Sequence, residues 1–304
     1  MIGNLQALVQ RELWEHRSIF VTPVAIAVVL SLLTVLALVS AAAFGSHVDL
    51  AVLTASNIGE LEKRAALMAF LSMPTMVFAI GSWILIVFYS LDTLYTERKN
   101  KSILFWRSLP LTETETVLSK LITALFVIPV VSLAIAAITH IVLLILASFW
   151  IMSVGADAGH LIWSSVPLFD IWLGTFIVAI AMVLWLSPFV GWFLFVSAFA
   201  RRSPFLIATM GIILLPIVEK IVLPTSFFGA AIWERTFRPP LADLDFVKFM
   251  DDDLHVEMTP DLVSMVSAID IQGFVSSPSL WAGMVVCGLF TTAAIYVRRY
   301  RDDS

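Results

Sequence analysis

Six long apolar runs alternate with polar connections along this chain. The runs cover residues 19–43, 67–91, 120–149, 170–200, 204–223 and 280–297. An apolar helix of about 18–20 residues crosses the hydrocarbon core of a bilayer, and every run reaches that length. Because lipid offers the main chain no hydrogen-bond partner, each crossing segment must be helical. The pattern therefore predicts an all-α integral membrane protein with six transmembrane helices.

Two of these runs carry further local signals. The first is longer than the roughly 7–15 apolar residues of a signal-peptide core, so it is expected to be a retained span. The fourth run is longer than one crossing needs, and Pro188 and Gly191 lie inside it. A kink or tilt is therefore expected in the fourth span.

The N-terminal residues 1–18 form an amphipathic segment. Ile2, Leu5, Leu8 and Leu13 recur at helical spacing, with mostly polar residues between them. A helix of this kind lies in the membrane interface with its apolar face toward the lipid. The alternative is a frayed cytoplasmic leader.

The remaining segments are an inner loop at 92–119, between the second and third spans, an outer connection at 224–279, and the last span with its tail at 280–304. Thr114 or Thr116 is expected to cap the third span, and Asp170 is expected to face water at the start of the fourth. Two places in the outer connection pair a capping hydroxyl with a following proline, which predicts the start of a helix. They are Thr259-Pro260-Asp261 and Ser277-Pro278. An outer cap of short helices follows from this pattern.

Composition and charge agree with a membrane environment. Hydrophobic residues make up 60% of the chain and charged residues 13%, about half the share usual in soluble domains. The six spans place four segments on one side of the membrane: the N-terminal segment, the inner loop with Lys120, the turn at 201–202 and the C-terminal tail. These segments hold twelve of the 18 basic residues, whereas fifteen of the 23 acids fall on the opposite side of the membrane. Basic loops remain in the cytoplasm, so the prediction is a multi-pass protein of the inner membrane with both termini cytoplasmic.

Residues that could carry chemistry are few. The chain has one cysteine, Cys287, which excludes a disulfide or a CxxC metal site within one chain. There is no HExxH pair, no phosphate-binding loop and no GxSxG nucleophile motif. The sequence therefore predicts no catalytic residue, no metal site and no cofactor bound by this chain. The five histidines include His140 in the third span, where a packing role is favoured over a place in a pathway.

The inner loop is the most informative segment. Four charged residues precede an apolar cluster at 103–106, and Pro110 then ends the predicted helix. An amphipathic helix at this place either lies on the lipid surface or docks into a groove of a partner protein. A plain positive-inside anchor is the third interpretation.

The pattern D…ER…SIL…LPL…ETVLSK over residues 92–120 resembles the loop after the second helix of ABC-2-type transporter permeases. The resemblance extends to the N-terminal helix, the six spans and the large outer connection, which is longer than in that family. It implies that the loop carries a coupling helix that contacts an ATPase subunit. The residues at that contact would be Glu97, Arg98, Lys99, Lys101, Ser102, Phe105 and Trp106, with Arg201 and Arg202 as a second contact.

The resemblance implies the permease subunit of an ATP-binding cassette exporter. ATP and Mg²⁺ would bind to the partner ATPase, and a second permease copy or a paralogue would complete the transporter in the lipid; no nucleic acid is expected. The apolar spans favour a lipid-like, drug-like or peptide substrate. Near the outer end of the fifth span, Glu219 and Lys220 are either interfacial or part of an outer gate. The alternatives are a membrane-embedded enzyme or processing factor and a scaffold for an outer assembly, both without transport.

Overall fold

The computed structural model describes residues 2–44, 59–101, 111–223, 225–238, 264–267 and 269–300. The cluster predicted at 103–106, which includes Phe105 and Trp106, lies outside these ranges, as does Ser102. The helix start predicted at Thr259-Pro260-Asp261 lies outside them as well.

The described residues are helical with short connections. In chain order the elements are α1 (Ile2–Glu15), α2 (Ser18–Phe44), α4 (Glu60–Lys99), α6 (Glu113–Ile122), the π-helical η1 (Thr123–Val127), α7 (Ile128–Ser153), the π-helical η2 (Gly159–Trp163), α8 (Leu168–Trp185), α9 (Ser187–Phe199), α10 (Pro204–Val222), α11 (Phe227–Phe237), α13 (Ile271–Ser276) and α14 (Pro278–Tyr300). Within the described ranges, six helices are long and apolar enough to cross a membrane, which confirms the six predicted segments. They begin at residues 18, 60, 113, 168, 204 and 278. This is the architecture of a multi-pass helical membrane protein.

The fourth run is divided into two helices. Helix α8 ends at Trp185 and α9 begins at Ser187, so Leu186 lies at the break. Pro188 stands at the start of α9, where a missing N–H costs no intrahelical hydrogen bond. The break confirms the irregularity predicted from this proline.

Helices α9 and α14 form the tightest described contact of the bundle. A Cβ atom on Gly191 would lie 2.9 Å from the carbonyl oxygen of Cys287, which shows how closely the two backbones approach. Around this contact, buried residues of α4, α6, α9 and α14 form the largest apolar core; they include Leu94, Val117 and Leu194. The bundle is therefore centred on α4, α9 and α14.

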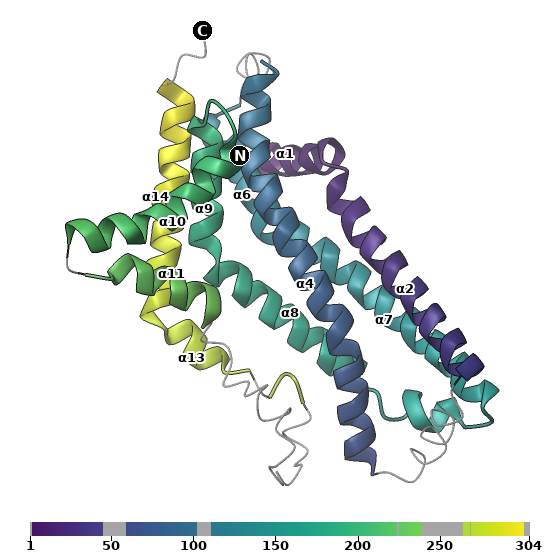
Figure 1. The fold of residues 1–304 in the computed structure, drawn as a ribbon. Helices are drawn as coiled ribbons and strands as arrows, with labels where there is room; N and C mark the ends of the chain where they lie inside the picture. The colour runs from purple at the N-terminus through teal and green to yellow at the C-terminus, as the bar shows by residue number, and fades with distance from the viewer. Residues whose placement is uncertain are drawn as a thin grey trace.

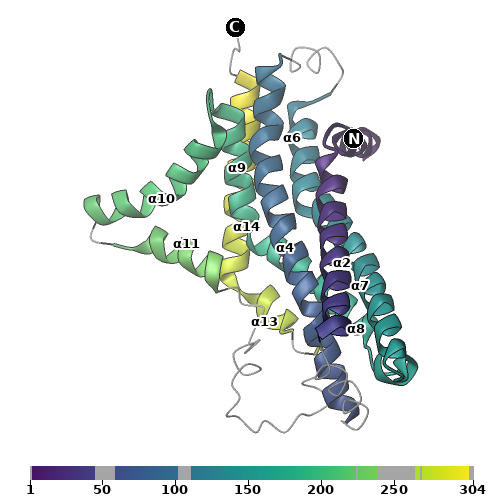
Figure 2. The same ribbon diagram turned by 45° about the vertical axis from the view of Figure 1, so that its right-hand side comes forward.

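Both ends of the described chain lie at the same end of the bundle (Figures 1 and 2). Helix α1 runs across this end, beside the start of α6, while α4, α9 and α14 finish there. Arg201 and Arg202 follow α9 after a single residue, Ala200, and Arg298 and Arg299 lie in the last turn of α14. We call this region the basic end.

Helices α10 and α11 form a V that projects from one side of the bundle (Figures 1 and 2). Helix α10 leaves the basic end after the Arg201-Arg202 turn and leans away from α9 and α14. Helix α11 then returns toward the start of α14. The fifth apolar segment is therefore followed at once by a second helix.

Two helix-start predictions need correction. Helix α6 is capped by Thr112, not by Thr114 or Thr116: the Thr112 hydroxyl accepts from the Glu115 amide at 3.2 Å, and the Glu115 carboxylate accepts from the Thr112 amide at 3.0 Å. Asp170 lies in the first turn of α8, but its carboxylate accepts hydrogen bonds from the Ser264 hydroxyl and the Met265 amide, each at 2.7 Å. It therefore holds part of the outer connection. The start of α14 at Pro278 is as predicted.

Candidate functional site

The last turns of α4 enter a cluster of buried charges at the basic end. Glu97 is only 2% exposed, and its carboxylate accepts from the Lys120 ammonium at 2.8 Å and from the Arg298 guanidinium at 2.6 Å. Arg11 also approaches this carboxylate, at 3.0 Å. Glu97 therefore joins α4 to helices α1, α6 and α14 at one point.

Lys120 lies at the centre of the cluster, 1% exposed. Besides Glu97, its Nζ atom donates to the Glu12 carboxylate at 2.9 Å and to the Thr93 hydroxyl at 2.8 Å. A lysine ammonium has three donors, and these three partners use all of them. Lys120 thus connects α6 to α1 and α4 through fully engaged hydrogen bonds.

Arg298 closes the cluster from the last helix. It is 3% exposed and pairs with Glu113 as well as with Glu97. We define Glu12, Glu97, Glu113, Lys120 and Arg298 as the charge cluster. Because the cluster draws its members from α1, α4, α6 and α14, it ties the first and last helices of the described chain together.

Glu12 is the member contributed by α1, and it is fully buried. Burial alone would raise the pKa of this carboxyl, but the charge of Lys120 and hydrogen bonds from Lys120 and Tyr89 hold its pKa below the usual value. The Tyr89 hydroxyl donates at 2.8 Å, and the His16 ring stands edge-on to the Tyr89 ring. Glu12 is therefore ionised at neutral pH inside the bundle.

The cluster makes relative motion of its helices costly. Removing one partner from a buried ion pair leaves an uncompensated charge and costs on the order of 3–5 kcal/mol. Pulling α4 away from α6 or α14 would separate such pairs. The geometry therefore favours movement of α1, α4, α6 and α14 as one unit at this end.

Arg98, the next residue of α4, makes a different connection. Its guanidinium donates to the carbonyls of Ser197 at 2.8 Å and Ala200 at 2.7 Å. These carbonyls lie at the C-terminal end of α9, where a helix lacks its own donors and favours a cation. Ala200 precedes Arg201 directly, so Arg98 brings the Arg201-Arg202 turn beside the end of α4.

The predicted coupling residues have different surroundings. Lys99, Lys101, Arg201 and Arg202 are exposed, and Arg98 is half-buried. Glu97 differs from the surface position that the resemblance implies, because its carboxylate is enclosed by cations of this chain. The exposed cations of the two predicted contacts lie at the same end of the bundle, whereas Glu97 acts inside it.

Glu12, Lys120 and Arg298 belong to a site that the sequence pattern did not predict. In the sequence, Lys120 and Arg298 stand out only as cations that flank apolar segments. A signal was present at Glu12, which follows Leu8 by four residues and therefore interrupts the apolar face of the first helix. An acid on an otherwise apolar helix face indicates a buried partner of opposite charge.

The predicted outer residues lie in the α10–α11 hairpin. Glu219 is 5% exposed, and its carboxylate accepts from the Thr225 hydroxyl at 2.9 Å and from the amides of Phe227 and Phe228 at 2.6 and 2.8 Å. It thereby caps the N-terminus of α11. Lys220 is exposed. The two residues point to different surroundings and do not form a pair.

His140 is packed between three helices. It is 1% exposed, Trp172 of α8 donates to its Nδ1 at 3.3 Å, and its Nε2 lies 3.2 Å from the Thr75 hydroxyl of α4. Both ring nitrogens are thus engaged, which agrees with the packing role favoured by the sequence.

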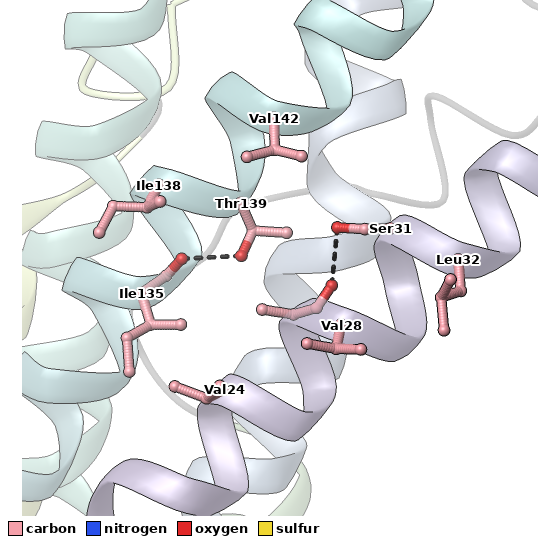
Figure 3. Close-up of a pocket in the computed structure, with 9 residues that line it drawn as sticks. Val24, Val28, Ser31, Leu32, Ile135, Ile138, Thr139 and Val142 are labelled. Atoms are coloured by element: carbon pink, nitrogen blue, oxygen red, sulfur yellow. Dashed lines mark hydrogen bonds between the residues drawn. The ribbon is translucent and has the colours of Figure 1, made fainter.

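An open groove runs between α2 and α7, with a volume of about 390 Å³ (Figure 3). Its lining is almost wholly apolar. The two hydroxyls in it, Ser31 and Thr139, donate to carbonyls of their own helices, each at 2.8 Å. The groove therefore suits an apolar chain such as the tail of a lipid, and it provides no charged group for a polar ligand.

Comparison with protein-family models, with curated proteins and with solved structures finds no match to this chain. The fold and the site define the class of this protein. It is a multi-pass helical membrane protein whose second, third and last apolar helices are joined by buried ion pairs at one end.

Proposed function

We propose that this chain is the permease subunit of an ATP-binding cassette exporter in the inner membrane, with the basic end in the cytoplasm. The observation that supports it most is the charge cluster at the end of α4. Helix α4 leads directly into the loop that resembles a coupling helix, and Glu97 and Arg98 attach its last turn to four other helices. Such an attachment is what transmission of force from a partner requires.

In this proposal the partner subunit binds ATP and Mg²⁺ and this chain converts its movement into transport. A push on the loop after α4 reaches α6 and α14 through Glu97 and reaches α9 through Arg98. Because separating the buried pairs is costly, the helices rock together and open a path outward. A second permease copy completes the path, and the substrate is lipid-like, drug-like or a peptide.

The surface offered to the ATPase consists of cations. Lys99, Lys101, Arg201 and Arg202 are exposed at the basic end, and an acidic groove on the partner complements them. Ser102, Phe105 and Trp106 are expected to complete the contact. Glu219 and Lys220 are the residues of the proposed outer gate, and Glu219 couples the end of α10 to α11 by accepting from the Phe227 and Phe228 amides.

The test is copurification of a stoichiometric ATPase after gentle solubilisation of the tagged chain. Reversal of Lys99, Lys101, Arg201 and Arg202 to glutamate should weaken retention of the ATPase about tenfold or more at low salt. High salt screens the contact, so the difference in retention between wild type and this variant should be smaller there. Arg238→Glu is the matched control, because Arg238 is an exposed cation after α11, outside the basic end. Absence of any ATPase from the wild-type preparation, or equal retention in all variants, contradicts the proposal.

A further inference from the structure

The turn between α10 and α11 lies level with the body of α14, a helix long and apolar enough to cross a membrane (Figures 1 and 2). Arg235, near the end of α11, donates to the carbonyls of Trp185 and Ser279, and the Trp185 indole donates back to the Arg235 carbonyl at 2.9 Å. These bonds fix the C-terminal end of α11 at the first turn of α14. From there α11, about 16 Å long for its 11 residues, points away from the bundle and toward the basic end (Figures 1 and 2). The turn is thus level with the body of α14.

The main chain at this turn is incompletely paired within the described residues. The last carbonyls of a helix have no intrahelical donor. Lys220 would accept from the amide four residues later, but that residue is Pro224, which has no N–H. Glu219 satisfies the first amides of α11, so the polar groups left open belong to the end of α10.

Lipid is not a suitable neighbour for such a turn. Non-helical backbone at membrane depth is tolerated only where protein covers it or water lines it. The described part of this chain does not cover it: Ile221 is 78% exposed, Val222 70% and Phe227 73%. Because these large apolar side chains surround the few open carbonyls, a protein contact fits the surface better than a water path.

We propose that the turn between α10 and α11 is the contact between two copies of this chain. The proposal rests on the second copy invoked in the proposed function and gives it an interface. In a two-fold contact the same surface meets itself. The exposed Lys220 ammonium has three donors, and the open C-terminal carbonyls of the opposite α10 are acceptors at the negative end of a helix dipole. Each copy therefore offers a cationic donor that fits the acceptor carbonyls of the other copy.

The test is disulfide and bis-maleimide crosslinking in native membranes, on a Cys287→Ala background. Single cysteines replace Ile221 and, as a second variant in case the first misfolds, Phe227. Leu33→Cys is the matched control, because Leu33 is an exposed apolar residue of α2, across the bundle from the hairpin. The expected result is conversion of the chain to a species of twice its mass for the two hairpin variants and not for the control.

Three outcomes overturn the interface. Labelling by a charged, membrane-impermeant thiol reagent without crosslinking means that water lines the turn. Failure of both reactions means that lipid covers it. Crosslinking only to a different protein means that the partner is not a second copy. Copurified ATPase is scored in the same membranes: retained ATPase without crosslinking refutes only the interface, and crosslinking without any ATPase refutes only the exporter function.

Discussion

Lys120→Met is expected to be the most destabilising single change at the basic end. Methionine retains most of the volume of the side chain but removes the ammonium that contacts Glu12, Glu97 and Thr93 at 2.8–2.9 Å. After the change Glu97 still has Arg298 at 2.6 Å. Glu12 keeps the neutral Tyr89 hydroxyl as a donor at 2.8 Å, but the basic side chains left near it are farther away, Arg11 at 4.0 Å and the His16 ring at 3.7 Å. The uncompensated charge therefore falls on Glu12, which is fully buried.

The size of the loss follows from that burial. Removing one partner of a buried ion pair costs about 3–5 kcal/mol of unfolding free energy. Exposed cations contribute little, so Lys99→Met, the matched control at the end of α4 in the same basic end, should change stability by less than about 0.5 kcal/mol. The measurement is equilibrium unfolding of the purified chain in mixed micelles.

A double variant separates charge from packing. In Lys120→Met/Glu12→Gln the stranded carboxylate becomes a neutral amide, so this variant should be more stable than Lys120→Met alone. The reasoning is refuted if Lys120→Met lies within about 1 kcal/mol of wild type, or if adding Glu12→Gln lowers stability further.

Three further expectations concern single residues. The folded-state pKa of Glu12 is lowered from 4.5, so its stabilising effect is complete above about pH 4.5 and is lost as the pH falls through the folded pKa; Glu12→Gln should flatten that part of a plot of stability against pH. Gly191→Ala places a methyl group 2.9 Å from the Cys287 carbonyl and should cost about 1–3 kcal/mol in a thermal melt, whereas Gly288→Ala, with open space at its Cβ position, should be near neutral. Thr112→Val removes the cap of α6 and should cost about 1 kcal/mol by the same assay, and an unchanged melting temperature would contradict the capping role.

The sequence by itself determined which segments are long and apolar enough to cross a bilayer and which end of the bundle is basic. Both are local properties: hydropathy is summed over about 20 neighbouring residues, and a run of cations needs no distant partner. The irregularity of the fourth segment was equally readable, because Pro188 acts on its own helix.

Only the tertiary structure decided which charges are buried and how α11 returns to the bundle after the fifth apolar segment. Glu97 and Lys99 are two residues apart and look alike in sequence, yet Glu97 is enclosed because α14 and α6 bring it Arg298, 201 residues away, and Lys120. The position of the end of α11 is set likewise by the bonds of Arg235 to α8 and α14. Burial of a charge is set by distant groups of opposite sign, and a local pattern does not contain their positions.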